Sequence, residues 1–329
     1  MIVLQSFGRL MSNSNPFMAM MVSALPSEFE TTYFSWKAAL TSNFDVFHVH
    51  WPESLVRDKS GIRRALKIAL FGIFMARLRL KKTPIVRTVH NIEPHEPADR
   101  IERWLLDRLD KRVALWVNLN DSTPSPHVNK TVTILHGHYK DRYSALDRTL
   151  PTPGRILYFG QIRPYKGVEA LIAEFLETDR AGMSLRLVGR PSEDRTRVRL
   201  ERAIAGDDRV RASFRHVEES ELAREILEAE LVVLPYRNLH NSGSLLLALS
   251  LDRPVLAPNT DTVRELRSEV GDDWVFTYEG ELTSKALENA AERVHLREVV
   301  SSPDLSRRDW PSLGRQLADV YYSVCAVRG

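Results

Sequence analysis

Cations, glycines and hydroxyl groups gather in two segments of the second half of this chain, in an order suited to binding a diphosphate. RILYFGQIRPYKG (155–167) is an apolar run followed by a loop with Arg163 and Lys166, directly before a predicted helix. LPYRNLHNSGSLLLAL (234–249) opens an apolar helix with polar residues and glycine. Cations and free N–H groups at a helix start attract phosphate oxygens, although a plain helix cap is the alternative for the second segment. The residues expected to bind the compound that carries the diphosphate, called the donor below, are Gly160, Arg163, Lys166, Gly189, Arg190, Val217, Tyr236, Asn241, Ser242, Gly243 and Ser244.

Imidazoles and carboxylates follow two apolar runs of the first half. DVFHV (45–49) leads into His50, Trp51 and Glu53, and PIVRTV (84–89) leads into a second group. If both runs are parallel strands, the two groups lie at the edge of a sheet where ligands bind. Such side chains can take a proton from a sugar hydroxyl or hydrogen-bond a sugar, and the alternative is that they cap the following helices. The second group is His90, His95 and Glu96, and His138, beside Gly137, is a further candidate against a purely structural turn.

The sequence lacks motifs that would direct a different phosphate chemistry. It contains no GxxxxGK[ST], no Asp-x-Asp pair for a metal-bound nucleotide sugar, and no Cys/His set with zinc spacing. We therefore expect no cofactor and no metal. Arg163, Lys166 and a helix N-terminus are expected to neutralise the departing diphosphate instead.

A basic amphipathic segment, residues 56–82, lies between the two groups of the first half. It carries nine lysines and arginines and a single acid, Asp58. Such a helix can lie in lipid headgroups with its cations toward anionic lipid, so we expect it to contact an anionic membrane surface. The alternative is an ordinary packed helix, and no aromatic platform or motif accompanies it that would favour nucleic acid. Its apolar centre is Leu66, Ile68, Leu70, Phe71, Ile73, Phe74 and Met75.

The elements that must position these residues alternate between short apolar runs and helical stretches, as in parallel sheets covered by helices. Strands are predicted at 1–6, 45–50, 84–89, 114–118, 132–135, 155–159, 184–188, 211–215, 231–234 and 254–257. Helices are predicted near 16–25, 60–80, 99–110, 167–178, 193–205, 219–228, 243–250 and 309–324. DRTLPTPG (147–154) is rich in turn formers and is the predicted linker.

This pattern predicts an α/β protein with two Rossmann-like domains facing across a cleft. The expected domains are an acceptor- and membrane-facing domain at 1–148, a nucleotide-sugar-binding domain at 153–308, and a terminal helix at 309–329 that returns to the first domain.

The composition is that of a globular protein. The 329 residues are 43% hydrophobic and 27% charged, and their number suits two domains of about 150 residues. The single cysteine, Cys325, excludes an internal disulfide framework and fits a reducing cytoplasm. Residues 1–150 carry a formal charge of +7 and the remainder −4, so the first domain is expected to face an anionic surface unless the charges are scattered by chance. Neither a secretion signal nor a membrane-spanning run is apparent. We expect a cytoplasmic protein attached peripherally to the inner face of the plasma membrane.

Six blocks in order resemble known glycosyltransferases. They are FDVFHVHWPE, VRTVHNIEPHE, ILHGHYKDRY, RPYKGVE, LPYRNLHNSGSLLLALSLDRPVLAP and VFTYEGE. The two-domain layout resembles the GT-B glycosyltransferases, and the ordered set is similar to the GDP-mannose:glycolipid 4-β-mannosyltransferases of xanthan-type exopolysaccharide assembly. The resemblance implies transfer of mannose, with inversion, from GDP-mannose to a glucuronic-acid-terminated oligosaccharide on polyprenyl diphosphate.

One departure from the broader GT-B pattern supports inversion. Many retaining relatives carry two glutamates eight positions apart, and those positions fall here on Leu239 and Leu247. The resemblance implies that Ser242 or Ser244 replaces the ribose-binding glutamate.

Inversion requires a base on the acceptor side, and Glu53 and Glu96 are the candidates. His90 lies at the strand end that corresponds to a donor-contacting position in many GT-B enzymes, so the resemblance implies that it touches the donor sugar. His50, Trp51, His95 and His138 are expected to touch the acceptor. The alternatives are another donor, such as UDP-glucose, and a scaffold that binds nucleotide or lipid without catalysis.

Overall fold

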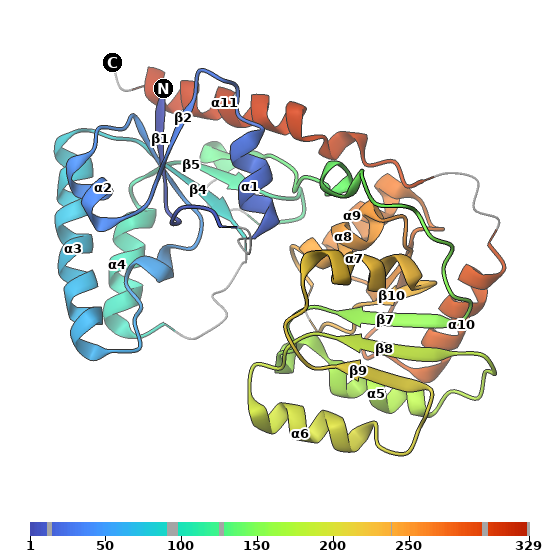
Figure 1. The fold of residues 1–329 in the computed structure, drawn as a ribbon. Helices are drawn as coiled ribbons and strands as arrows, with labels where there is room; N and C mark the ends of the chain where they lie inside the picture. The colour runs from blue at the N-terminus through green and yellow to red at the C-terminus, as the bar shows by residue number, and fades with distance from the viewer. Residues whose placement is uncertain (12–14, 91–97, 125–127, 238, 298–301, 328–329) are drawn as a thin grey trace. The chain divides into compact units, whose positions relative to one another are not determined.

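The chain forms two compact α/β units, drawn in Figure 1. The computed structural model describes residues 1–11, 15–90, 98–124, 128–237, 239–297 and 302–327. The first unit consists of residues 1–137 and 307–329, and the second of residues 138–306.

The first unit is built on a parallel sheet whose strand order reverses between β1 and β3. In spatial order the strands are β2 (Glu30–Tyr33), β1 (Ile2–Gln5), β3 (Val46–Val49), β4 (Ile85–Val89), β5 (Val113–Asn118) and β6 (Thr131–Thr133). β2 lies on one side of β1, whereas β3 to β6 follow on the other. At such a switch point the loops beyond two neighbouring strands separate and leave room for a ligand.

Helices cover both faces of this sheet (Figure 1). α1 (Pro16–Ser23) and α11 (Trp310–Ala326) pack on one face, where Phe17, Trp310 and Tyr321 are buried. α2 (Trp36–Thr41), α3 (Gly61–Leu80) and α4 (Arg100–Asp110) pack on the other, with Phe74 and Leu109 fully buried. Successive strand residues point to opposite faces, so β3 supplies Val46 to one core and Phe47 to the other.

The second unit has a parallel sheet with the Rossmann strand order. In spatial order the strands are β12 (Val275–Tyr278), β11 (Val255–Pro258), β10 (Leu231–Val233), β7 (Arg155–Phe159), β8 (Ser184–Val188) and β9 (Val210–Ser213). Its helices are α5 (Val168–Leu176), α6 (Asp194–Ala203), α7 (Glu219–Glu228), α8 (Gly243–Ser250), α9 (Asp261–Val270) and α10 (Ser284–His295). The switch point lies between β7 and β10. The predicted α/β class with two Rossmann-like sheets is confirmed.

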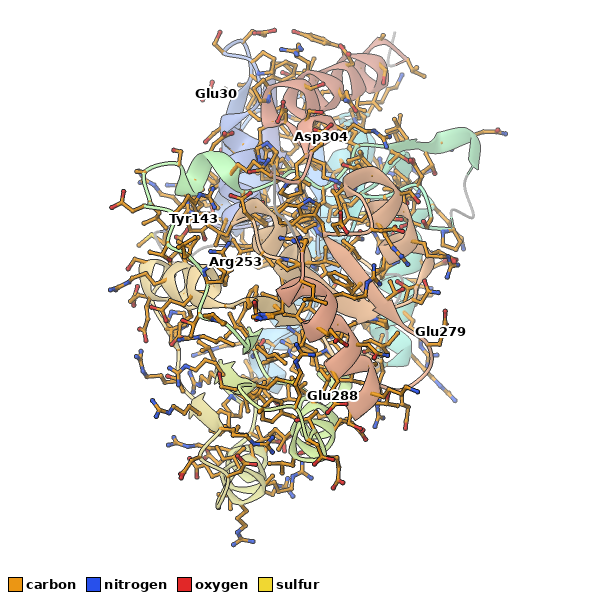
Figure 2. The ribbon with its side chains drawn as sticks, turned by 90° about the vertical axis from the view of Figure 1, so that its right-hand side faces the viewer. Glu30, Tyr143, Arg253, Glu279, Glu288 and Asp304 are labelled. Atoms are coloured by element: carbon orange, nitrogen blue, oxygen red, sulfur yellow. The ribbon has the colours of Figure 1, made fainter. Side chains whose placement is uncertain are left out.

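The segment that follows Gly137 packs on the second unit, before the boundary predicted at 148. Tyr139 N–H donates to Ser250 Oγ at 2.9 Å, and Lys140 Nζ donates to the carbonyl oxygen of Pro303 at 2.8 Å. Arg253, labelled in Figure 2, donates to the carbonyl oxygen of Thr149 at 2.8 Å. These bonds fix the segment against the second unit and explain why the compact units divide earlier than the turn-rich stretch at 147–154.

Candidate functional site

The two predicted diphosphate segments meet at the switch point of the second sheet. Gly160 follows β7 with φ +109°, a backbone conformation that favours glycine. A Cβ on Gly160 would lie 3.6 Å from Lys166 Nζ and 3.7 Å from Ser244 Oγ. The ammonium of Lys166 and the hydroxyl of Ser244, which come from two different loops of the unit, therefore converge on the backbone at Gly160.

Glycines let the surrounding loops approach closely. A Cβ on Gly167, where φ is +65°, would stand 2.0 Å from the carbonyl oxygen of Pro235. A backbone hydrogen bond joins the same two loops, because Arg237 N–H donates to the carbonyl oxygen of Tyr165 at 3.1 Å. The loops after β7 and β10 are therefore joined through their backbones, which holds Lys166 in place.

Tyr236 adds a buried hydroxyl to this site. Its side chain is 7% exposed, and Lys166 Nζ lies 4.8 Å from the centre of its ring, in a cation–π contact. Within the described ranges, the Tyr236 hydroxyl has no hydrogen-bond partner. A buried hydroxyl without a partner costs free energy, so this group is suited to bind a ligand.

The start of α8 supplies the hydroxyls and N–H groups of the second segment. Ser242 caps the helix, because its Oγ accepts a hydrogen bond from Leu245 N–H at 3.2 Å. The Ser242 side chain therefore acts as an ordinary helix cap, whereas the hydroxyl group of Ser244 approaches Gly160. Asn241 and Gly243 lie beside them at the helix start, where the first N–H groups have no helical carbonyl to bind.

The remaining predicted donor residues lie at the ends of β8 and β9 and in the loop after β7. Gly189 brings its backbone against Gly160, whose carbonyl oxygen would stand 1.9 Å from an added Cβ. Arg190 is exposed, and its carbonyl oxygen accepts from Ile162 N–H at 3.0 Å. Arg163 Nε donates to Gln161 Oε1 at 3.1 Å.

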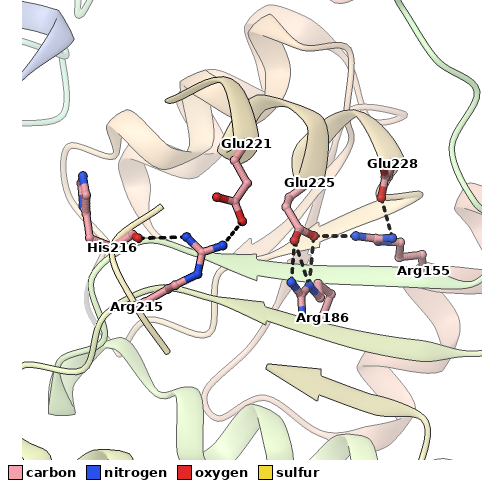
Figure 3. Close-up of polar contacts among 7 residues, drawn as sticks. All are labelled: Arg155, Arg186, Arg215, His216, Glu221, Glu225 and Glu228. Carbon is pink, nitrogen blue, oxygen red and sulfur yellow. Dashed lines mark hydrogen bonds and ion pairs between the residues drawn. The ribbon is translucent and has the colours of Figure 1, made fainter. Parts of the chain in front are cut away.

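Val217 is half-buried in a segment fastened to α7. Figure 3 shows Arg215 bound both to Glu221 of α7 and to the carbonyl oxygen of His216. On the same helix Glu225 pairs with Arg155 and Arg186, so α7 is fixed to β7 and β8. This network fixes the segment that carries Val217.

A chain of hydrogen-bonded side chains stands at the switch point of the first sheet. His50 Nδ1 lies 3.0 Å from His90 Nε2, and His50 Nε2 lies 3.1 Å from Gln5 Oε1. The indole of Trp51 stacks on His90, with ring centres 4.1 Å apart and an interplanar angle of 21°. His50 is 2% exposed, so it lies behind His90 rather than on the surface.

A second buried histidine connects three elements next to this chain. His48 is 0% exposed; its Nδ1 lies 2.7 Å from the Tyr321 hydroxyl of α11 and its Nε2 lies 2.8 Å from Thr88 Oγ1 of β4. Burial lowers the pKa of His48 to about 3 and lowers the pKa of both His50 and His90 well below its usual value. All three imidazoles are therefore neutral near pH 7.

Beside Trp51 lies a groove of about 600 Å³ walled by aromatic rings. Phe7, Phe34, Trp36 and Trp51 line it together with three serines and Lys67 of α3. Aromatic walls with a few polar groups are typical of sites for small ligands. Apart from Trp51, the aromatic residues of the groove were not predicted from the sequence, because the groove is formed after three different strands.

The candidate bases and the remaining predicted acceptor residues differ in burial and in hydrogen bonding. Glu53, in the turn Pro52–Leu55 after β3, is half-buried, and its carboxylate makes no hydrogen bond or ion pair with any described residue. His95 and Glu96 fall outside the described residues. His138 is 3% exposed, and its Nδ1 accepts from Lys140 N–H at 3.2 Å, a contact that serves the turn.

Helix α3 has two apolar faces. Phe71, Phe74 and Leu78 pack on the sheet, whereas the opposite side exposes large apolar side chains to solvent. Residues at 100° steps place Ile62, Leu66, Ala69, Ile73, Ala76 and Leu80 in one line, which we call the outer stripe. Arg63 and Arg79 are exposed on its two sides. The side chains that pack on the sheet and the exposed apolar side chains thus lie on opposite faces of one helix.

The described residues contain neither a cluster of metal-binding side chains nor a membrane-spanning helix. No group of three or more His, Cys, Asp or Glu side chains is arranged there to hold a metal ion. None of the helices there combines the length and apolarity needed to cross a membrane.

Comparison with known proteins relates the chain to glycosyltransferases. Residues 153–295 match the model of the family described as glycosyl transferases group 1. The chain is 44% identical over 304 residues to the GDP-mannose:glycolipid 4-beta-D-mannosyltransferase of Xanthomonas campestris pv. campestris, an alignment that covers 92% of this chain and 87% of that one. The predicted resemblance is therefore confirmed.

Solved structures share the fold at low sequence identity. Anabaena HepE in complex with UDP and glucose is 14% identical, with a TM-score of 0.67 over 98% of this chain and 100% of that chain. Sucrose-phosphate synthase from Thermosynechococcus elongatus is also 14% identical, with a TM-score of 0.57 over 99% of each chain. The predicted GT-B fold is confirmed by these similarities.

Proposed function

Because the chain belongs to the glycosyltransferase family that includes the GDP-mannose:glycolipid 4-beta-D-mannosyltransferase of Xanthomonas campestris, we propose that it transfers mannose from GDP-mannose to a lipid-linked oligosaccharide. The acceptor is a glucuronic-acid-terminated oligosaccharide on polyprenyl diphosphate, and the product enters exopolysaccharide assembly. The observation that carries this proposal is the 44% identity across 92% of the chain, which spans both sheets.

The donor diphosphate binds at the switch point of the second sheet. Lys166 Nζ neutralises its charge, and the Ser244 and Tyr236 hydroxyls hydrogen-bond its oxygens or the ribose. Their convergence near Gly160 supports this assignment, as does the buried Tyr236 hydroxyl without a partner in the described ranges. The free N–H groups at the start of α8 add a positive potential at the same place. No metal is needed in this proposal, because the protein's own charges stabilise the leaving group.

The acceptor binds in the first unit, and the reaction inverts the sugar. The aromatic groove beside Trp51 can bind the apolar face of a sugar ring, while serine hydroxyls meet its hydroxyl groups. The acceptor hydroxyl attacks the anomeric carbon as GDP leaves, and a carboxylate takes its proton. Glu53 is supported as this base by its carboxylate, which has no partner among the described residues, and by its place next to the groove residue Ser54. Glu96 is the other candidate.

Peripheral membrane binding brings the enzyme to its lipid-linked acceptor. The outer stripe of α3 enters the headgroup region, and the cations beside it bind anionic lipid on the inner face of the plasma membrane. The exposed fractions of Ile62 and Leu80, 86% and 85%, support this role, because such apolar exposure costs free energy in water.

Transfer of radiolabelled mannose tests the reaction. The chain is incubated with GDP-mannose and lipid-extracted, glucuronate-terminated acceptor, with UDP-glucose in a parallel reaction and EDTA in a third. Label in the lipid fraction from GDP-mannose alone, unaffected by EDTA, is the expected result. Transfer from UDP-glucose only would overturn the donor, and loss with EDTA would overturn metal independence. A β-linked product, identified by NMR, is expected for inversion of the α-linked donor.

A further inference from the structure

One ammonium group stands among the aromatic rings and serines of the groove beside Trp51. Lys67 of α3 is the single charged side chain among the described residues that line this groove, and that side chain is 30% exposed. No aspartate or glutamate is among those lining residues. An anionic group that enters the groove therefore meets the Lys67 ammonium and no acid of the groove wall.

Two contacts hold the Lys67 ammonium in position. Its Nζ donates to the carbonyl oxygen of Arg57 at 2.6 Å and lies 3.3 Å from Asp58 Oδ2. Ser60 N–H donates to Asp58 Oδ1 at 3.1 Å, and this hydrogen bond, together with Lys67, lowers the pKa of the Asp58 carboxyl. An ammonium has three N–H donors. The contacts within the described ranges use two of them, so the third can be donated to a ligand in the groove.

Two serines of the groove also have protons to donate. Ser6 Oγ accepts from His50 N–H at 2.9 Å, and Ser35 Oγ accepts from Ala38 N–H at 3.0 Å. These bonds use the hydroxyl oxygens, which leaves both hydroxyl protons for a ligand. With Lys67 the groove thus supplies three hydrogen-bond donors, one of them charged, and a carboxylate is a group that only accepts.

We propose that Lys67 is a specificity-determining residue that binds the carboxylate of a uronic acid at the end of the acceptor oligosaccharide. The aromatic rings cover the apolar face of that sugar, and the ammonium distinguishes it from the corresponding neutral hexose. In a hexuronic acid the carboxylate is attached to C5, next to the carbon that carries the 4-hydroxyl, so binding the carboxylate also places that hydroxyl. This role rests on the proposed transferase function and assigns recognition of its acidic acceptor to one side chain.

The acceptor carries a second anion, the diphosphate of its lipid carrier, and an ammonium can bind either. The groove favours the carboxylate, because its four aromatic side chains can stack on the sugar ring that bears it, whereas a diphosphate has no apolar face. Chemical reduction of the terminal sugar removes the carboxylate and leaves the diphosphate, so experiment can separate the two.

Kinetics with two acceptors test the role. One acceptor ends in glucuronic acid, and the other is the same lipid-linked oligosaccharide with that carboxyl group reduced, so that it ends in glucose. Wild type should use the acidic acceptor with a kcat/KM roughly 10- to 100-fold higher, the effect of one charge-assisted hydrogen bond. Lys67→Met should abolish this preference by losing activity on the acidic acceptor alone, whereas Lys67→Arg keeps the charge and should keep a preference.

Lys81→Met is the matched control. Lys81 follows the last turn of the same helix, lies outside the groove lining, and donates from Nζ to Asn43 Oδ1 at 3.2 Å. Its replacement removes the same charge from the basic segment and should keep the wild-type ratio of the two acceptors. Equal use of both acceptors by wild type would overturn the proposal. An equal loss on both acceptors in Lys67→Met would also overturn it, because that result would place Lys67 on the lipid diphosphate.

Binding of the sugar alone separates this role from the proposed reaction. The Kd values of methyl β-D-glucuronide and methyl β-D-glucoside are measured by saturation-transfer NMR on the full chain, with no nucleotide sugar present. Wild type and Lys81→Met should bind the glucuronide several-fold more tightly, and Lys67→Met should bind both sugars equally. This pattern would support the role even if mannosyl transfer failed, and equal binding of both sugars by wild type would overturn it even if transfer succeeded.

Discussion

Replacing Leu66 and Ile73 of α3 by serine should release the chain from anionic vesicles and leave it folded. Both side chains lie in the outer stripe, 59% and 56% exposed, and neither belongs to the core beneath the helix. In the membrane-bound state the exposed parts of both side chains leave water.

The size of the effect follows from the area exposed. Complete burial of a leucine or isoleucine side chain is worth about 1.5–3 kcal/mol. A little over half of each side chain is available here, so the pair contributes about 2–3 kcal/mol to membrane binding, or roughly 30- to 150-fold in affinity. The cost to folding should stay below about 1 kcal/mol, because only exposed helix positions change.

Vesicle co-sedimentation measures the prediction. Wild type and Leu66→Ser/Ile73→Ser are compared on vesicles with and without anionic lipid, over a range of salt concentrations. The control is Val198→Ser/Leu296→Ser, which removes exposed apolar side chains of the second unit, 44% and 71% exposed. Melting temperatures confirm that all variants are folded.

Two results would refute the reasoning. The double variant of α3 could bind anionic vesicles as tightly as wild type, which would show that the outer stripe does not enter the lipid. Alternatively, wild type could bind neutral and anionic vesicles equally, which would remove Arg63 and Arg79 from the interaction.

Four further changes test the sites. Lys166→Ala should weaken GDP binding about 10- to 100-fold, because a charge-assisted hydrogen bond is lost; an unchanged calorimetric Kd would contradict the diphosphate site. Gly160→Val should also weaken GDP binding, because its branches enter the space between the cation and the hydroxyl and its φ of +109° disfavours valine; wild-type affinity in a folded variant would be the contrary result. Glu53→Gln should lower kcat about 10²- to 10⁴-fold at unchanged GDP affinity, and wild-type turnover would leave Glu96 as the candidate base. Burial lowers the pKa of His48 to about 3 and the pKa of His136 to about 4. In the unfolded chain both imidazoles have the usual histidine pKa of 6.5 and take up protons below it. The folded state is therefore destabilised relative to the unfolded state as the pH falls through 6.5. The free energy of unfolding in urea should fall by roughly 2 kcal/mol for each of the two between pH 7 and pH 5, and a flat pH dependence would contradict their burial as neutral groups.

The sequence predicted most of the architecture because the central strands are short apolar runs between helical stretches. It missed the edge strands β2 and β12, and β2 explains why: its sequence, Glu30–Tyr33, is polar, as edge strands often are. It also left α2, α9 and α10 unassigned. The edge strands β6 and β9 were predicted, so an edge position alone does not hide a strand, and the polar residues of β2 are what removed its signal.

The candidate sites, too, were predicted only in part from the sequence. Lys166 and Ser244 were predicted together because each lies at a helix start, which is a local signal. Gln5 gave no such signal, since it ends an apolar strand and becomes meaningful only through His50, far along the chain. The aromatic groove was also missed, because its walls follow three strands that only the sheet order brings together.

The path of the chain has a consequence for the order in which the enzyme can be made. Helix α11 follows the entire second unit, yet it supplies Trp310 and Tyr321 to the core of the first, and Tyr321 holds His48 behind the histidine site. A ribosome therefore delivers every residue of the second unit before the first can close its core. The second unit can fold as one continuous stretch while the first waits with an open, apolar sheet face. During synthesis the first unit is thus the last to mature, and α11 is the helix that completes its core.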